Sequence, residues 1–369
     1  MYIYINNLVI FLLFILPLIS SVLGVFAYLP LVLFLFSYIF IVYYYKRHVY
    51  LSAEFYKIFI LLFFMLLYAL VSQRLNVIFF SFMSILHLFF SYFLIFQDKK
   101  KILKISLSVL ILFYLFVAYS GFTIGWSHLD MNNYFLNSSR NALVAMGIFY
   151  QILYSVNFYR VYGNMPLLSP VLLTALAIIA IGRSGIAISF LIILFSNFIR
   201  FYNSKKSLKI FLCIIGVGCT VYFYNYLKDL LEILVGATKF SRGFETERID
   251  LFLSYLNIVD FEMFLIGVNL QDTIPFCYFG GNPHNSFILG HSFYGLFYIL
   301  FIVFFLFAST SSVLIYKYTI VYYFLFLVFL LRLNFDILGL PGVYDFIFYY
   351  VFLLLTIKKA KKPRDIIKI

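Results

Sequence analysis

Charge is what this chain of 369 residues has least of. Only 11% of its residues are Asp, Glu, Lys or Arg, whereas 65% are hydrophobic, and the mean hydropathy is +1.04. A soluble globular domain carries about 25% charged residues, so this composition is not that of a soluble protein. Apolar runs such as residues 31–45 lack the two-residue alternation of membrane β-strands, which leaves helices as the spanning elements. We therefore expect an all-α, polytopic integral membrane protein.

Cysteine and the common metal-binding motifs are also scarce. The three cysteines, Cys213, Cys219 and Cys277, have no CxxC spacing and imply no disulfide framework. The sequence contains no HExxH or HxxxH pattern and no glycine-rich phosphate loop with a lysine. We therefore expect neither a metal nor any other cofactor.

Acidic residues are about half as common as basic ones. The 14 Asp and Glu residues face 27 Lys and Arg residues, which gives a formal net charge of +13 at pH 7. The basic residues form short clusters between apolar runs, as in loops that border membrane spans, so we expect no nucleic-acid partner. About twelve spans are expected. Their approximate residues are 8–23, 25–45, 57–71, 77–96, 105–120, 141–160, 166–181, 186–201, 210–227, 285–307, 318–333 and 344–357.

The basic residues are divided unevenly between the two sides of these spans. Most lie on the side of both chain termini, which predicts cytoplasmic termini and an external large loop, residues 228–283. We expect one polytopic domain over residues 1–369, with the first apolar stretch retained as a helix. Arginine outnumbers lysine on the external side, and its bidentate pairing with phosphate suits a substrate whose phosphate is carried on a lipid. The external basic residues are Arg74, Arg140, Arg183, Lys228, Lys239, Arg242, Arg248 and Arg332.

Arg183 is the first candidate for an anion contact. It lies in the sequence Ile-Gly-Arg-Ser-Gly, residues 181–185, between two spans and without a neighbouring acidic residue. An arginine at the end of a span can extend its charge to the membrane interface without any further role. Alternatively, it faces a cavity and binds an anion.

Two more arginines, Arg242 and Arg248, lie in the large loop. The apolar residues after them recur with helical spacing, which predicts an amphipathic helix that lies on or against the membrane. Arg248 either contacts a substrate or forms a surface ion pair with Glu245. The apolar residues of this helix are Ile249, Phe252, Leu253, Leu256 and Val259.

His284 is the candidate for proton transfer. It lies in the sequence Gly-Gly-Asn-Pro-His-Asn, residues 280–285, which predicts a tight turn before a helix that Asn282 or Asn285 caps. A lone histidine is usually structural, but this one stands in a polar turn at a membrane surface. An imidazole with a pKa near 6.5 suits proton transfer from a sugar hydroxyl, and the helix start offers free N–H groups to phosphate oxygens. We expect His291, seven residues later, and Gly295 to serve in packing.

These motifs, in this order, resemble the O-antigen ligase and polymerase superfamily, and most of all the O-antigen polymerases of the Wzy type. Two positions depart from the family pattern: Asn269 stands where a second glycine is expected, and Glu262-Met263-Phe264 where a proline is frequent. The matching residues are Gly182-Arg183-Ser184-Gly185, Arg248 with Phe252, Ile266-Gly267-Val268, and His284-Asn285-Ser286-Phe287-Ile288 followed by Gly295.

The resemblance implies a glycosyltransferase of the bacterial inner membrane with a periplasmic active site. Its donor and its acceptor are both undecaprenyl-pyrophosphate-linked oligosaccharides, and the donor's pyrophosphate is the leaving group. Membrane lipids and a protein that regulates chain length are further candidate partners. Arginines are expected to hold the pyrophosphate, and a histidine to activate the acceptor hydroxyl. The expected catalytic residues are His284, Arg183 and Arg248, and the expected substrate-binding residues are Arg242, Asn285 and Gly281.

Other functions remain open at this point. An O-antigen ligase shares the donor and the motifs and differs in its acceptor, lipid A–core. A flippase for lipid-linked oligosaccharides is a candidate of another class, and it predicts two similar halves, but no internal repeat is visible. A purely structural scaffold does not need the external arginines or the His-Asn pair.

Overall fold

The computed structural model describes residues 2–23, 32–33, 35–39, 52–135, 139–203 and 247–357. All the regular secondary-structure elements of these described residues are helices. The longer ones are α1 (Tyr2–Leu23), α3 (Ala53–Ser72), α4 (Leu75–Ile95), α5 (Lys99–Thr123), α6 (Arg140–Tyr162), α7 (Leu168–Ile179), α8 (Arg183–Asn203), α11 (Glu247–Ile258), α14 (Leu296–Ile315), α15 (Ile320–Leu333) and α16 (Asp345–Thr356). The short ones are η1 (Asp130–Asn133), α12 (Phe261–Ile266), η3 (Leu270–Asp272), η4 (Phe276–Phe279), α13 (Ser286–Tyr294) and η5 (Lys317–Thr319).

Six of these helices are long and apolar enough to cross a membrane: α3, α4, α5, α6, α8 and α14. Shorter apolar helices lie within α1 and at α7, α15 and α16. The helices indicate a membrane-embedded, all-α protein, as predicted, while the number of twelve spans stays a prediction. The predicted span 210–227 and most of the predicted span 25–45 lie outside the described residues.

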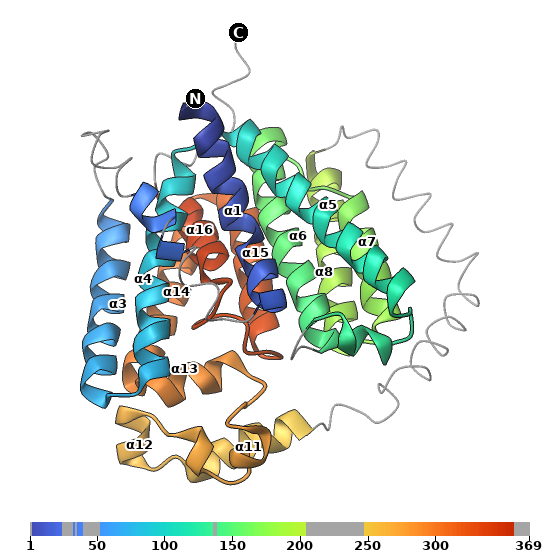
Figure 1. Ribbon diagram of the computed structural model, residues 1–369. Helices are drawn as coiled ribbons and strands as arrows, with labels where there is room; N and C mark the ends of the chain where they lie inside the picture. Colours follow the sequence, from blue (N-terminus) through green and yellow to red (C-terminus); the bar gives the residue numbers. More distant parts are fainter. Residues whose placement is uncertain are drawn as a thin grey trace.

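Helix α16 forms the centre of the bundle, and α4, α6, α14 and α15 surround it (Figure 1). All of its residues are buried, which follows from its sequence because it is apolar on every side. Helices α5, α7 and α8 pack on the far side of α6, and α3 packs on α4 (Figure 1). Helix α1 begins at one end of the bundle, and α11, α12 and α13 lie together at the opposite end (Figure 1).

The chain reaches α16 through a non-helical segment, residues 334–344, inside the bundle. The carboxylate of Asp345 accepts hydrogen bonds from the backbone N–H of Leu340 at 2.7 Å, that of Gly342 at 3.1 Å and the hydroxyl of Ser84 at 2.8 Å. Ser84 lies in the middle of α4, so α16 begins about halfway along the bundle. Irregular backbone is tolerated at such depth only where the protein satisfies its polar groups, as it does here.

One of the predicted spans is not a single continuous helix. Residues 285–307 were expected to form a single helix, but the chain breaks at Gly295 into α13 and α14. Gly295 has φ of 53°, and a Cβ atom there would lie 2.1 Å from the carbonyl oxygen of Leu265. This glycine therefore permits both the bend and the close approach of the end of α12. As a result, α13 lies across the end of the bundle (Figure 1).

Helix α11 is present as predicted, but its apolar residues divide between two sides. Leu251 and Tyr255 are buried in a small core that they share with Val268, Leu270, Phe276 and Ile288. By contrast, Phe252, Leu253 and Leu256, which the amphipathic pattern placed on its apolar face, are exposed. The cap formed by α11, α12 and α13 therefore has an apolar core of its own and an apolar outer surface.

Candidate functional site

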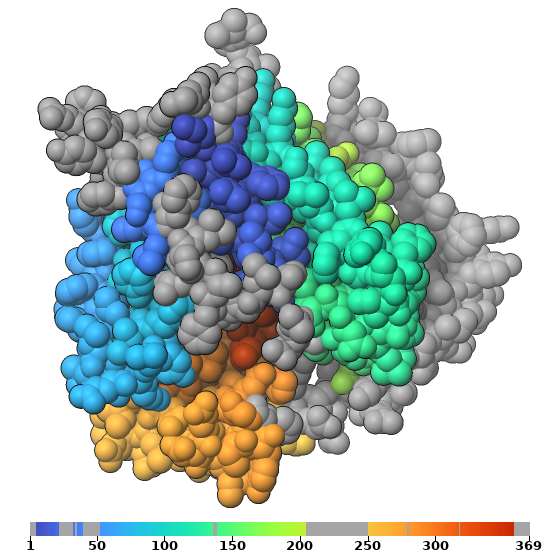
Figure 2. Space-filling model, in the orientation of Figure 1, coloured from blue at the N-terminus to red at the C-terminus, as the bar shows by residue number. Residues whose placement is uncertain are grey.

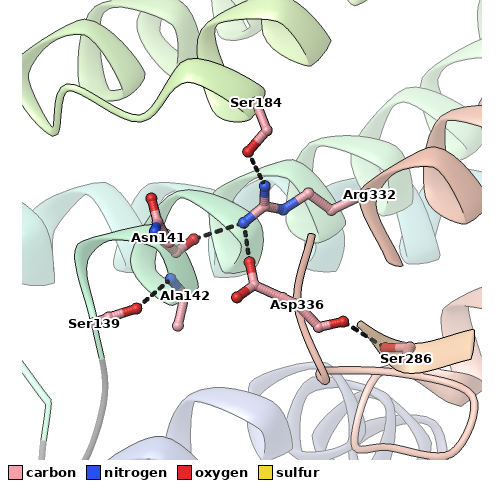
Figure 3. A network of polar contacts seen from close by, with 7 residues as sticks. All are labelled: Ser139, Asn141, Ala142, Ser184, Ser286, Arg332 and Asp336. Atoms are coloured by element: carbon pink, nitrogen blue, oxygen red, sulfur yellow. Dashed lines mark hydrogen bonds and ion pairs between the residues drawn. The ribbon is translucent and has the colours of Figure 1, made fainter. Parts of the chain in front are cut away.

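A buried ion pair joins three helix starts at the capped end of the bundle (Figure 3). Arg332, in the last turn of α15, is only 1% exposed and pairs with Asp336. Its Nη1 donates a hydrogen bond to the hydroxyl of Ser184 at 2.7 Å, and its Nη2 donates to the carbonyl oxygen of Asn141 at 2.9 Å. The hydroxyl of Ser286 donates to the carbonyl oxygen of Asp336 at 2.5 Å. The pair thus connects the starts of α6, α8 and α13.

The three helix starts give this place a positive electrostatic character. The first N–H groups of a helix have no partner inside the helix, and the macrodipole places partial positive charge there. Two further arginines begin helices at the same place: Arg140 begins α6 and Arg183 begins α8. Each is the chain neighbour of a residue that Arg332 contacts. Nη1 of Arg140 is shielded from solvent and has no hydrogen-bond partner among the described residues. Such a place suits an anion.

The glycines around Arg183 explain how it comes to lie beside α6. A Cβ atom on Gly185 would lie 2.4 Å from Cγ1 of Val144, so only glycine permits this contact between α8 and α6. A Cβ atom on Gly182 would be at an ordinary 3.6 Å from Oδ1 of Asn141. In the sequence Gly-Arg-Ser-Gly, Gly185 thus permits close helix packing, Arg183 supplies a positive charge, and the hydroxyl of Ser184 accepts a hydrogen bond from Arg332.

The turn that contains His284 is held by its asparagines. His284 has φ of 50°, and its backbone N–H donates to Oδ1 of Asn282 at 2.8 Å. Asn285 is the residue that caps α13: its Oδ1 accepts from the N–H of Phe287 at 2.8 Å and of Ile288 at 3.2 Å. Of the two predicted caps, Asn285 forms this one and Asn282 orders the turn.

Two of the expected substrate-binding residues, Asn285 and Gly281, have structural roles. The side-chain oxygen of Asn285 is engaged in capping α13. Gly281 has φ of 79°, and a Cβ atom there would lie 2.9 Å from Cγ of Gln271, so the turn needs glycine for its conformation. Roles of these residues in substrate binding stay predictions.

The expected catalytic residues come together in part. His284 is two residues from Ser286, and Arg183 precedes Ser184, so both flank residues of the Arg332–Asp336 network. Arg248 is in the first turn of α11, but its side chain lies outside the described part of the structure. Arg242 lies wholly outside it. Arg183 and His284 are therefore the two expected residues whose chain neighbours the network connects, and their catalytic roles stay predictions.

His291 packs, as expected, and it does so with a defined tautomer. Its Nε2 lies 3.1 Å from the carbonyl oxygen of Phe264, which can only accept, so Nε2 carries the proton. Its Nδ1 then accepts from the hydroxyl of Tyr255 at 2.6 Å. Burial lowers the pKa of His291 and outweighs the opposing hydrogen bond to Phe264. His291 thereby holds α11 and α12 on α13 as a neutral side chain.

Among the arginines of the expected external side, two have structural roles that were not recognised from the sequence. Arg74, in the turn between α3 and α4, donates from Nη1 to the carbonyl oxygens of Val268 at 3.4 Å and Ser292 at 3.2 Å, and from Nη2 to that of Phe293 at 3.5 Å. It supplies a cation to the end of α13, where the carbonyls carry partial negative charge. The second is Arg332. A charged residue in an apolar helix with an acidic residue four positions later was the signal available for it.

Comparison with known proteins yields no relative. No protein-family model, no curated protein and no solved structure matches the chain. Function is therefore inferred from the site and from the motifs that form it.

Proposed function

We propose that this protein is a polysaccharide polymerase of the O-antigen type. It is a glycosyltransferase that joins undecaprenyl-pyrophosphate-linked repeat units at the periplasmic face of a bacterial inner membrane. The observation that carries the proposal is the meeting of the helix starts of α6, α8 and α13 around buried Arg332 (Figure 3). This meeting brings the Gly-Arg-Ser-Gly and His-Asn motifs, about 100 residues apart in the sequence, to one place.

The arginines and helix starts form the donor side of the proposed site. Asp336 is the acidic partner in the network, and it is already paired with Arg332. Arg140, whose Nη1 has no hydrogen-bond partner among the described residues, adds positive charge for a pyrophosphate beside this pair. Negative charge grows on the pyrophosphate as its bond to the donor sugar breaks, and fixed cations stabilise that charge without reorganising. Arg183 holds the phosphate oxygens in this proposal, because a guanidinium matches them in a bidentate manner.

His284 forms the acceptor side. The hydroxyl oxygen of the acceptor sugar attacks the anomeric carbon of the donor sugar, and the bond between that carbon and the pyrophosphate oxygen breaks. The hydroxyl proton passes to His284 as general base. The products are a longer glycan on one lipid carrier and a free undecaprenyl pyrophosphate. The left-handed backbone conformation of His284, stabilised by the hydrogen bond to Asn282, fixes the orientation of this residue just before α13.

The orientation in the membrane is part of the proposal. The positive-inside pattern assigns both termini to the cytoplasm and the cap to the periplasm. In support, α1 begins at the end of the bundle opposite the cap (Figure 1). The full proposal has twelve spans, of which six are among the long apolar helices of the described residues.

A deletion strain tests the proposal. Its surface polysaccharide is separated on a gel after complementation with wild type, His284→Ala or Arg183→Ala. A ladder that collapses to one repeat unit, and that neither variant restores at normal protein level, supports the polymerase and both residues. Arg200→Ala, at the other end of α8, and His128→Ala, in the loop after α5, are matched controls that restore the ladder.

The same gel distinguishes the rival functions. Loss of every polysaccharide band from lipid A–core, with long chains accumulating on the lipid carrier, identifies a ligase. An unchanged ladder in the deletion strain contradicts both the polymerase and the ligase.

A further inference from the structure

Helix α12 exposes the residues that a water-facing helix would hide. None of its residues is buried. Phe261 is 78% exposed and Ile266 is 48% exposed, and Phe264 and Leu265 are exposed as well. Phe261, Phe264 and Leu265 share the i, i+3, i+4 spacing, so they lie on one face of the helix. Hiding such a face from water is worth about 25 cal/mol per Å² of apolar area.

The surroundings of α12 show what covers this face. The hydroxyl of Tyr68, near the end of α3, donates a hydrogen bond to the carbonyl oxygen of Ile266. The ring of Tyr68 also lies 5.9 Å from that of Phe297, at the start of α14. Here α3 and α14, two of the membrane-crossing helices, expose apolar side chains such as Val71 and Leu300. Helix α12 therefore extends the lipid-facing surface of α3 and α14.

The pictures agree with this placement. Helix α12 lies directly beyond the ends of α3 and α4 (Figure 1). In the space-filling view, the gold surface at the lower left, where α12 lies, adjoins the blue surface of α3 and α4 (Figure 2).

We propose that α12 is an interfacial anchor that lies in the lipid leaflet at the capped end of the bundle. Its apolar face enters the boundary between headgroups and acyl chains, the usual position of a monotopic amphipathic helix. The polar groups at its start suit the aqueous side: Asp260 caps the helix by accepting from the N–H of Met263 at 2.7 Å, and Glu262 is exposed. The occupant of the face is lipid, because the face continues the exposed apolar surface of α3 and α14, which are long and apolar enough to cross a membrane.

The anchor is tied firmly to the rest of the cap. The N–H of Val268 donates to the carbonyl oxygen of Ser292 at 3.0 Å, and His291 binds the carbonyl of Phe264 at 3.1 Å. A Cβ atom on Gly267 would lie 2.5 Å from the carbonyl oxygen of Ser292, so the two backbones are in direct contact. The depth of α12 in the leaflet therefore sets the depth of α13. This inference does not depend on the proposed function.

Depth-dependent fluorescence quenching tests the anchor. Trp126 is the single tryptophan, so Trp126→Phe gives a background in which one new tryptophan reports one position. Phe261→Trp and Leu265→Trp are made separately in the full chain, which is reconstituted in phosphatidylcholine vesicles with brominated acyl chains. Phe261 is 78% exposed and has room for the larger ring, and the less exposed Leu265 gives a second reporter on the same face. Phe63→Trp, on the exposed side of α3, is the lipid reference, and Asp272→Trp, in η3, is the water reference.

We expect bromine near the headgroup end of the chains to quench positions 261 and 265 about as strongly as deeper bromine quenches position 63. Iodide in the buffer should quench them far less than position 272. Strong iodide quenching at 261 and 265 without quenching by brominated lipid would place α12 in water and overturn the proposal. Protection from both quenchers would show a protein covering α12, and this outcome also overturns it.

Discussion

The hydroxyl of Tyr255 lies 2.6 Å from Nδ1 of His291, and this contact joins the loop helix α11 to the core-facing side of α13. In the neutral imidazole Nδ1 accepts the Tyr255 proton, whereas a protonated Nδ1 can only donate, so the hydroxyl would have to turn its proton away. The opposite nitrogen is bound to Phe264 on α12 at 3.1 Å. One neutral side chain therefore connects the three helices of the cap.

The cap is predicted to loosen in acid. Burial lowers the pKa of His291 in the folded protein, whereas the unfolded value is about 6.5. At this group the unfolded state therefore binds more protons below that pH, so the contribution of His291 to stability falls as the pH drops through about 6.5 and is constant above it. Thermal unfolding in detergent at pH 8 and pH 5 measures the loss. His291→Gln, which does not titrate, should reduce the difference between the two pH values, whereas His128→Gln should keep it. An equal loss in His291→Gln would assign the acid effect to other groups.

Removing only one partner of the Arg332–Asp336 ion pair is predicted to lower the stability of the protein strongly. Asp336→Asn leaves the guanidinium of Arg332 buried without its counter-charge, and removing one partner of a buried pair costs about 3–5 kcal/mol. The double variant Arg332→Met, Asp336→Asn leaves no buried charge there and should be more stable than Asp336→Asn alone. Unfolding temperatures of the purified variants measure this order. Glu262→Gln, which removes an exposed carboxylate, is the control and should change little. A double variant less stable than the single one would contradict the prediction.

The two glycines around Arg183 are predicted to differ in their tolerance of alanine. Gly185→Ala places a methyl group 2.4 Å from Cγ1 of Val144, and such overpacking typically costs about 1–3 kcal/mol. Gly182→Ala meets its nearest atom at 3.6 Å and should be tolerated. Val144→Ala removes the clashing methyl group, so it should restore most of the stability of Gly185→Ala. The same unfolding measurement decides, and failure of this rescue would show that Gly185 is needed for another reason.

A comparison of Gly295 with Gly280 distinguishes the cost of a positive φ from the cost of a steric clash. Both have positive φ, which costs a residue with a Cβ atom about 1–2 kcal/mol. A Cβ atom on Gly280 meets nothing within 4 Å, whereas one on Gly295 would lie 2.1 Å from the carbonyl oxygen of Leu265. Gly295→Ala should therefore destabilise the protein more than Gly280→Ala, and it should expose the cap to limited proteolysis. Equal effects of the two changes would show that the close approach at Gly295 relaxes.

Much of the helix content was predictable because hydropathy and turn residues are local signals. Helices α3, α4 and α6 lie within a few residues of the predicted spans, and Asn285 caps α13 from a position that the sequence suggested. The break at Gly295 was missed because residues 285–307 are apolar enough for one span. That glycine's function depends on Leu265, which lies in another part of the chain.

The candidate site was predictable only in fragments. Arg183 and His284 were predicted from their motifs, but Arg332 and Asp336, which connect the neighbouring Ser184 and Ser286, belong to no motif. The side chain of Arg248 and all of Arg242 lie outside the described residues, so their expected roles stay predictions. Asn285 and Gly281 have structural tasks that the spacing alone did not distinguish from substrate binding.

The sequence by itself determined that this chain lies in a membrane as helices, because apolar runs of about 20 residues have no other stable form in lipid. It also predicted where the polar turns lie and which arginines belong to the expected external side. Only the tertiary structure decided that α16 starts inside the bundle, that α13 turns across its end, and that Arg332 binds the starts of α6 and α8. Each feature depends on residues far apart in the chain: Asp345 with Ser84, Gly295 with Leu265, and Arg332 with Asn141 and Ser184. The spacing of residues along a sequence does not specify which distant segments pack together, so the assembly of the site became visible only in the fold.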